Sequence, residues 1–307
     1  MNGISWYDIN TYFAQLLMIF FLINIRWISW KKKPTDKKAE MSFIEHLDEL
    51  RKHIFRSVIA IVIGAIIMAV YNNFIVKKIL MGPTHVDFPT YTYLCKLGHW
   101  LGFTDTLCLE KINIKMQSNA VAGQFNVYLN IILIGGFIIA FPYVFWQFWK
   151  FIRPALKKNE LSKTSGVILW VSLLFFMGVL FGYFVIAPYT INFFANFTLD
   201  DNIENIWTIA SYFNTIVPLI IGSGLAFQLP LLLYFLAKID VVSTAFLKKY
   251  RRHAILIIVI LVSIITPPDM LSTIICSIPL ILLYEISIFL CIGVEKKKRK
   301  QEQVEWS

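Results

Sequence analysis

The sequence carries little charge for its size. Asp, Glu, Lys and Arg make up 16% of its 307 residues, whereas hydrophobic residues make up 57%. A soluble domain has about a quarter charged residues and about half apolar ones. The composition therefore excludes a disordered chain and a small disulfide scaffold, and it argues against a soluble enzyme. Because a spanning helix takes about 20 apolar residues, it predicts a membrane domain with several spans.

The patterns of catalysis and cofactor binding are also missing. The sequence has no glycine-rich nucleotide loop, no nucleophile with a base and no metal-ligand spacing. Its histidines are scattered without pairs four residues apart, which makes a metal site improbable. These histidines are His46, His53, His85, His99 and His253. We expect no enzymatic activity, no cofactor and no metal.

The excess of positive charge does not indicate a nucleic-acid partner. The formal net charge is +10, but the basic residues lie in short segments between apolar runs. The positive-inside rule predicts such loops on the cytoplasmic side. No Lys or Arg occurs in 188–208 or 266–270. The basic segments are 31–56, 153–163, 238–252 and 296–300. We therefore expect both ends of the membrane domain to be cytoplasmic, with no nucleic-acid binding.

Six apolar runs predict six transmembrane helices. They are Ser57–Val76, Gln124–Trp149, Gly166–Ala187, Ile209–Ala237, Ala254–Ile265 and Leu271–Ile292. The fifth run is too short for the full hydrocarbon thickness, so its helix crosses a thinned bilayer or leans on its neighbours. The predicted fold class is an all-α integral membrane protein with six transmembrane helices, of which the fifth and sixth are short.

The first forty residues allow two interpretations. Thr11–Ile25 is apolar and is followed by basic residues, which is compatible with an extra N-terminal hydrophobic helix. Alternatively, Met41 is the functional start and residues 1–40 are an inessential extension, which we favour. The chain then divides into this extension, a membrane domain over 41–294 and a basic cytoplasmic tail over 295–307.

Several motifs follow one another in a fixed order along the chain. The first is FIEHLDELRK, which spans Phe43–Lys52. The others are Gly82-Pro83, Phe151–Leu156 with Glu160, Phe227–Pro230, the turn Thr266–Asp269, and Glu285. Together they resemble the TatC family of twin-arginine translocase receptors, over Met41 to about Val294. This resemblance implies a non-enzymatic receptor in the bacterial cytoplasmic membrane that binds twin-arginine signal peptides of folded proteins.

The resemblance implies a signal-peptide site on the cytoplasmic face. Glu49 and Glu160 match family positions that hold the two arginines, and a carboxylate is the natural bidentate partner of a guanidinium. Arg51 and Phe151 match positions near the same surface. Each of these residues also has an alternative interpretation without a ligand. Glu49 would be a solvated acid on a helix and Glu160 a screened acid in a loop. Arg51 would be one of the cytoplasmic positive charges, and Phe151 an aromatic anchor at the membrane interface.

Other matching positions suggest docking, structural or coupling roles. By resemblance, Gln228 docks the single-span helix of a TatA- or TatB-like partner, or else it joins helices within the chain. Glu285 is an ionisable group within an apolar span, which makes it a functional candidate by default. It is either structural or responsive to the proton gradient. Pro83 is a structural or coupling position, and Asp269 is expected to cap the sixth helix, with partner contact as the second interpretation.

The four cysteines form two pairs in different settings. Cys276 and Cys291 lie in the last apolar run and are interpreted as small buried hydrophobic residues. Cys95 and Cys108 lie in a long outward segment, where an oxidising periplasm would favour a disulfide. We therefore predict a Cys95–Cys108 disulfide.

The leading hypothesis is a translocase core subunit, with TatA- and TatB-like partners, self-association and transport driven by the proton-motive force. A secondary transporter for a small solute is the alternative, but such proteins usually have internal repeats, and none is apparent. An intramembrane enzyme is a third possibility that lacks a catalytic constellation.

Overall fold

The computed structural model of the chain describes residues 43–85, 88–100, 116–152, 164–200, 202, 205–239, 241–265 and 270–305. The chain divides into two compact units between Leu50 and Arg51. The described part of the first unit is the start of a helix, and the second unit contains the packed helices. Residues 1–40, Cys108, Glu160 and Asp269 lie outside the described residues, so the predictions made for them stay predictions.

The described residues are almost entirely helical. The α-helices are α2 (Phe43–Val70), α3 (Asn72–Phe74), α4 (Pro89–Trp100), α5 (Gly123–Ile152), α6 (Thr164–Phe181), α7 (Ala187–Asn196), α8 (Ile209–Ala226), α9 (Leu229–Lys238), α10 (Thr244–Lys249), α11 (Arg251–Ile265) and α12 (Met270–Glu305). Two π-helices, η1 (Ile75–Leu80) and η6 (Gly182–Ile186), and a 3₁₀ turn, η2 (Gly82–Thr84), join them. The short strands β1 (Met116–Gln117) and β2 (Trp207–Thr208) pair in parallel.

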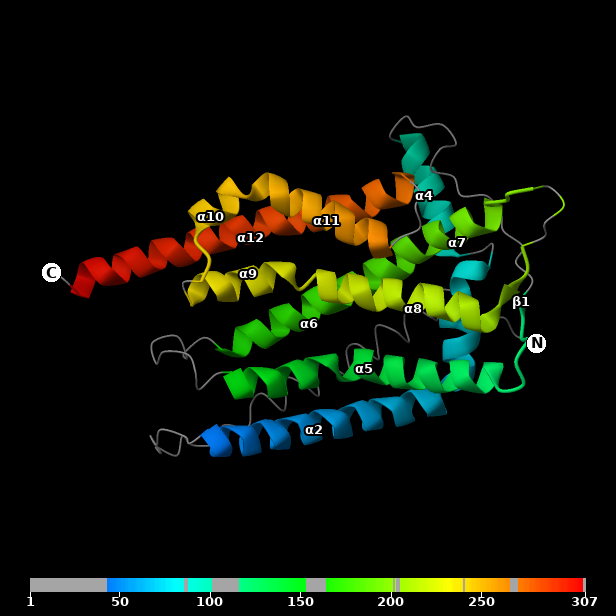
Figure 1. Ribbon diagram of the computed structural model, residues 1–307, viewed down its shortest axis with the longest axis horizontal. Coiled ribbons are helices and arrows are strands. Elements are labelled where there is room, and N and C mark those ends of the chain that lie inside the picture. The colour runs from blue at the N-terminus through cyan, green and yellow to red at the C-terminus, as the bar shows by residue number, and fades with distance from the viewer. Residues whose placement is uncertain are drawn as a thin grey trace. The chain divides into compact units, whose positions relative to one another are not determined.

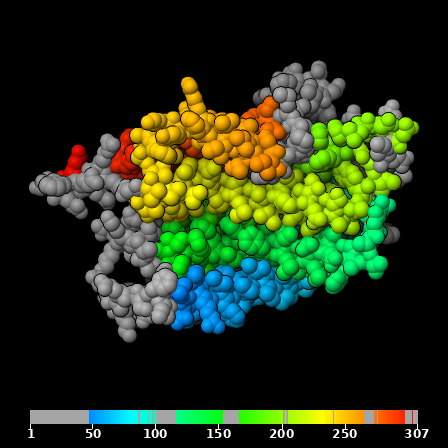
Figure 2. All heavy atoms as spheres, viewed as in Figure 1, coloured from blue at the N-terminus to red at the C-terminus, as the bar shows by residue number. Residues whose placement is uncertain are grey.

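Within the second unit, long helices pack side by side. Helix α6 packs on α8, α5 packs on both, and α12 packs on α9 and α11 (Figure 1). The largest buried apolar cluster joins α8, α9, α11 and α12, and it includes Ile216, Ala237, Ile258 and Ile288. Figure 2 shows α8 and α9 in yellow, adjoined by α10 and α11 in orange.

Five of the described helical segments are long and apolar enough to cross a membrane. They are Leu47–Val70, Gly123–Ile152, Gly166–Asn196, Ile209–Lys238 and Cys276–Lys296. The fifth predicted run forms α11, a helix of 15 residues, which is below the usual spanning length of about 17–25 residues. The structure therefore supports five of the six predicted spans by length. The span predicted over Ala254–Ile265 stays a prediction.

Two predicted boundaries differ from the structure. The final helix is not short, because α12 has 36 residues and continues through the basic tail to Glu305. Lys, Glu, Gln and Arg are good helix formers, and nothing in that tail breaks a helix. At the other end, the helix of the first predicted span begins well before Ser57, because α2 starts at Phe43 and has 28 residues.

Small residues let the long helices approach closely. A Cβ atom added to Gly136 on α5 would lie 2.6 Å from the backbone nitrogen of Ala65 on α2. On the other pair, a Cβ atom added to Gly178 of α6 would lie 2.6 Å from the carbonyl oxygen of Ser223 on α8. Membrane helices associate through such backbone contacts, because lipid provides no hydrophobic drive between them.

The close approach of Gly136 to Ala65 gives a stability prediction. Gly136→Ala places a methyl group against the α2 backbone, so the helices must separate, and we expect the free energy of unfolding to fall by about 1–3 kcal/mol. Unfolding in detergent measures the change. Gly293→Ala on α12 is the matched control, because no atom lies within 4 Å of the position its Cβ would take. Equal stability of the two variants would contradict the prediction.

Candidate functional site

The predicted recognition residues that the structure describes lie on two helix ends. Glu49 and Arg51 are in the first turns of α2, where the Glu49 side chain is half-buried and that of Arg51 is exposed. Phe151 is the penultimate residue of α5 and is half-buried. These residues lie at helix ends because Glu49 and Arg51 precede the first apolar run and Phe151 follows the second one in the sequence. The clustering of Glu49 with Glu160 stays a prediction, since Glu160 lies outside the described residues.

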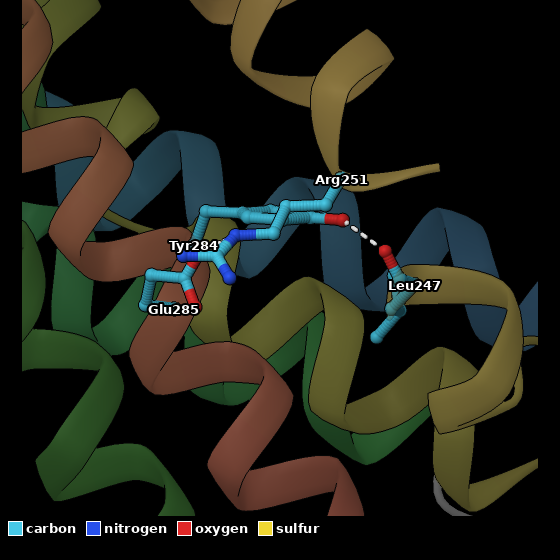
Figure 3. Close-up of polar contacts among 4 residues, drawn as sticks. All are labelled: Leu247, Arg251, Tyr284 and Glu285. Carbon is cyan, nitrogen blue, oxygen red and sulfur yellow. Dashed lines mark hydrogen bonds and ion pairs between the residues drawn. The ribbon is translucent and has the colours of Figure 1, made fainter. Parts of the chain in front are cut away.

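Glu285 forms an ion pair with Arg251. The Arg251 Nε atom lies 2.5 Å from Glu285 Oε1, and the relative exposures of the two side chains are 55% and 26%. Arg251 is the first residue of α11, and Figure 3 shows its guanidinium beside the carboxylate of Glu285 on α12. The sequence prediction treated Glu285 as the one acid within a span and did not find its cation. The pair joins α11 to α12, and the structural and coupling interpretations of Glu285 both stay predictions.

Two further polar contacts fasten the α10–α11 segment to α12. The Tyr284 hydroxyl donates to the carbonyl oxygen of Leu247 at 2.9 Å (Figure 3). The Glu295 carboxylate accepts hydrogen bonds from the backbone amide of Thr244, at 2.6 Å, and from the Thr244 hydroxyl. Glu295 thereby satisfies a first-turn amide of α10, which has no partner within its own helix. Helix α10 is thus bonded to α12 through Thr244 and Leu247, and α11 is bonded to α12 through Arg251.

Gln228 lies at the break between α8 and α9. Its Nε2 atom donates to the carbonyl oxygen of Val171 on α6 at 3.2 Å, so the predicted role as interhelical glue has a partner in the structure. Its Oε1 atom is buried and accepts no hydrogen bond. A buried acceptor without a donor costs about 1–3 kcal/mol. One end of this amide therefore joins two helices, and the other end lies inside the fold without a donor.

Pro83 lies buried in the 3₁₀ turn η2, and tyrosine hydroxyls hold the chain around it. Tyr183 donates to the carbonyl oxygen of Ile79 at 2.6 Å, and Tyr212 donates to that of Leu80 at 2.8 Å. Tyr91 of α4 donates to the Pro83 carbonyl oxygen. Burial raises the pKa of Tyr91 to about 12, so this hydroxyl stays protonated as a donor at neutral pH. The surroundings of Pro83 support its structural role.

The described cysteines have two different states. Cys276 and Cys291 are buried and form no disulfide, which agrees with their interpretation as small hydrophobic residues. Cys95 on α4 is disulfide-bonded. Because Cys108 lies outside the described residues, its pairing with Cys95 stays a prediction.

A cavity of about 300 Å³ lies between the end of α7 and the start of α8. Aromatic side chains of Phe194, Phe197 and Trp207 form part of its wall, together with Ser211 and Thr215. Among the residues that the structure describes, none of the predicted site residues lines this cavity.

The comparisons with known proteins agree with this geometry. Residues 45–279 match the family described as "Sec-independent protein translocase protein (TatC)". The chain belongs to the TatC family. It is 44% identical to a TatC of Blattabacterium over 86% of this chain and 99% of that protein, and 33% identical to one of Desulforapulum autotrophicum over 87% and 90%.

Solved TatC structures share its fold. The crystal structure of a twin-arginine translocase receptor TatC superposes with a TM-score of 0.61 and is 30% identical, over 82% of this chain and 100% of the other. Membership in the TatC family confirms the predicted class, a subunit of a protein translocase with a transport role, and the predicted location as a multi-pass protein of the inner membrane. The small-solute transporter is not favoured.

Sequence reasoning missed the groups that complete these sites. Arg251 was counted as one more cytoplasmic charge, yet it pairs with Glu285. Tyr183 and Tyr212 carry no sequence signal except that they lie near the ends of apolar runs predicted to face outward, where aromatic residues with a polar tip are common. Such partners come from distant parts of the chain, so residue spacing does not reveal them.

The Arg251–Glu285 pair gives a prediction with a defined asymmetry. Arg251→Leu leaves the more buried member, Glu285, without its cation, and we expect the unfolding temperature in detergent to fall by on the order of 5 °C. Glu285→Leu leaves an arginine that is more than half exposed, so its effect should be smaller. The double variant should recover most of the loss. Additive losses in the double variant would show that the pair does not act as a unit.

Proposed function

We propose that this TatC protein is the receptor that captures twin-arginine signal peptides at the cytoplasmic ends of its helices. Glu49 and Glu160 bind the two guanidinium groups, and Arg51 and Phe151 contribute to the same surface. The observation that carries the proposal is the fold shared with the solved twin-arginine translocase receptor, together with acids at both matching motif positions. The half-buried setting of Glu49 also favours a carboxylate that is incompletely solvated.

The chemistry of the arginine side chain gives this site its selectivity. A guanidinium presents a rigid planar fork of donors that matches both oxygens of a carboxylate, whereas lysine is a strongly hydrated point charge. Two acids can therefore distinguish paired arginines from paired lysines although the charge is the same. No proton transfer or bond making is needed, so the site binds its ligand without catalysis.

We further propose six spans with both ends of the membrane domain in the cytoplasm. In this arrangement α11 is the short fifth span, because the turn 266–270, which has no Lys or Arg, follows it and the basic segment 238–252 precedes or overlaps its start. Its polar contacts with α12 let a helix of 15 residues hold its depth in the membrane. Asp269 then caps the following helix on the outward side.

TatA- and TatB-like single-span proteins are the proposed partners, with transport driven by the proton-motive force. The unsatisfied acceptor of Gln228 supports docking, because a polar group on a partner helix would satisfy Oε1 inside the membrane once the side chains that cover it move aside. The Val171 bond uses only the Nε2 end of the amide. Self-association of the receptor in the assembled complex belongs to the same proposal.

A peptide-binding measurement tests the receptor function. We expect the full chain in lipid nanodiscs to bind a twin-arginine signal peptide at least tenfold more tightly than its twin-lysine counterpart. Removing a charged hydrogen-bond partner is worth about 1.5–3 kcal/mol, so Glu49→Gln or Glu160→Gln should weaken binding by about 10–100-fold. In cells, each variant should insert normally and fail to export a twin-arginine reporter.

Asp48→Asn is the matched control for the Glu49 variant. It removes the same charge from the neighbouring position, which points about 100° away around the helix, and its side chain is exposed. We expect it to bind and export as the unchanged chain does. Loss of affinity in Asp48→Asn equal to that in Glu49→Gln would show that general negative charge, and not a specific carboxylate, captures the peptide.

A further inference from the structure

A buried hydrogen bond joins α2 to α5 near the helix ends that carry the proposed recognition residues. The Nδ1 atom of His53 lies 2.7 Å from Oε1 of Gln147. The two side chains are 8% and 1% exposed, respectively. With the Gln147 amide in this orientation, the bond requires the His53 tautomer that carries its proton on Nδ1, because the amide oxygen can only accept. No motif or spacing in the sequence pairs these two residues.

The bond shares one antiparallel register with the close contact of the same two helices. Gly64 lies eleven positions after His53 on α2, and Gly136 lies eleven positions before Gln147 on α5. A Cβ atom on Gly64 would lie 2.6 Å from the carbonyl oxygen of Gly136, so the backbones nearly touch there. Eleven residues of helix measure about 16 Å. The two contacts therefore fix the helix pair at separated points.

A polar contact at this place is not needed for packing alone. The glycine contact already holds the helices together, and an apolar pair of similar volume would fill the space without the desolvation of two polar groups. A hydrogen bond differs because it is directional. It fixes the rotation and the axial position of each helix, in the manner of buried polar groups that specify register.

Both residues lie one helical turn from a proposed recognition residue. His53 is four positions after Glu49 on α2, and Gln147 is four positions before Phe151 on α5. Residues four apart share a helix face. The rotation that the bond sets for each helix is therefore also the rotation of the face that carries Glu49 or Phe151.

We propose that His53 and Gln147 are positioning residues for signal-peptide capture: their hydrogen bond fixes the register of α2 against α5, and thereby the presentation of the recognition residues. The inference rests on the proposed receptor function. His53 and Gln147 themselves do not contact the peptide. They act through the helices, as supporting residues do when they hold a binding group to its working geometry.

Peptide titration of the full chain in nanodiscs tests the inference. His53→Leu and Gln147→Leu each leave one buried partner unsatisfied, and each should weaken twin-arginine binding about tenfold. The exchanged pair, His53→Gln with Gln147→His, can form the same bond in reverse and should return affinity to within threefold of the unchanged chain. Photo-crosslinks from position 49 to the peptide should fall and recover in parallel.

Tyr284→Phe is the matched control. It removes one interhelical hydrogen bond of similar length, on α12, and should leave peptide affinity and crosslinks unchanged. Unfolding temperatures are measured on all variants. If the leucine variants bind normally, or if the exchanged pair recovers its unfolding temperature without recovering affinity, the positioning role is overturned.

The same experiment separates this inference from the receptor function. Should Glu49→Gln lose binding while His53→Leu and Gln147→Leu retain it, the receptor function stands and the positioning role fails. Should the unchanged chain bind twin-arginine and twin-lysine peptides equally, the receptor function fails and the positioning role fails with it.

Discussion

The satisfaction of backbone carbonyls where helices are interrupted is the constraint on which this structure depends. Hydrocarbon offers no hydrogen bonds, so each free backbone group in the membrane needs a partner from the protein. Tyr183 and Tyr212 supply donors at the end of η1, and the Ser223 hydroxyl donates to the carbonyl oxygen of Gly178 at 2.7 Å, one turn before η6. These side chains allow helices that bend, shift register and end inside a packed bundle.

The same constraint explains why so few polar groups occur within the spans and why those present are shared between helices. Gln228 sits at the α8–α9 break and donates to α6, and Arg251 at the start of α11 meets Glu285 on α12. A polar group that joins two helices is worth about 0.6–2 kcal/mol in lipid. Its larger effect is geometric, because each bond selects one rotation of each helix. The helices therefore present the residues at their ends in a fixed direction.

Hydropathy predicts the architecture well because a spanning helix is a property of one segment. Five of the predicted runs became long apolar helices, and the run in 254–265 became a helix of 15 residues. Ends were less predictable, since hydropathy does not distinguish a solvated helix from a loop: α12 continues to Glu305 through a stretch of charged helix formers. Pairings such as Arg251 with Glu285 are properties of two segments, so neither run alone predicts them.

The candidate site divides along the same line. Glu49 and Glu160 are proposed from motifs alone, because a motif specifies a particular residue type at a particular place in the chain. What holds such a residue in place has no fixed type. His53 with Gln147, or two glycines, can each set the register of α2 and α5. Such supporting contacts join side chains from distant segments, and the structure is needed to find them.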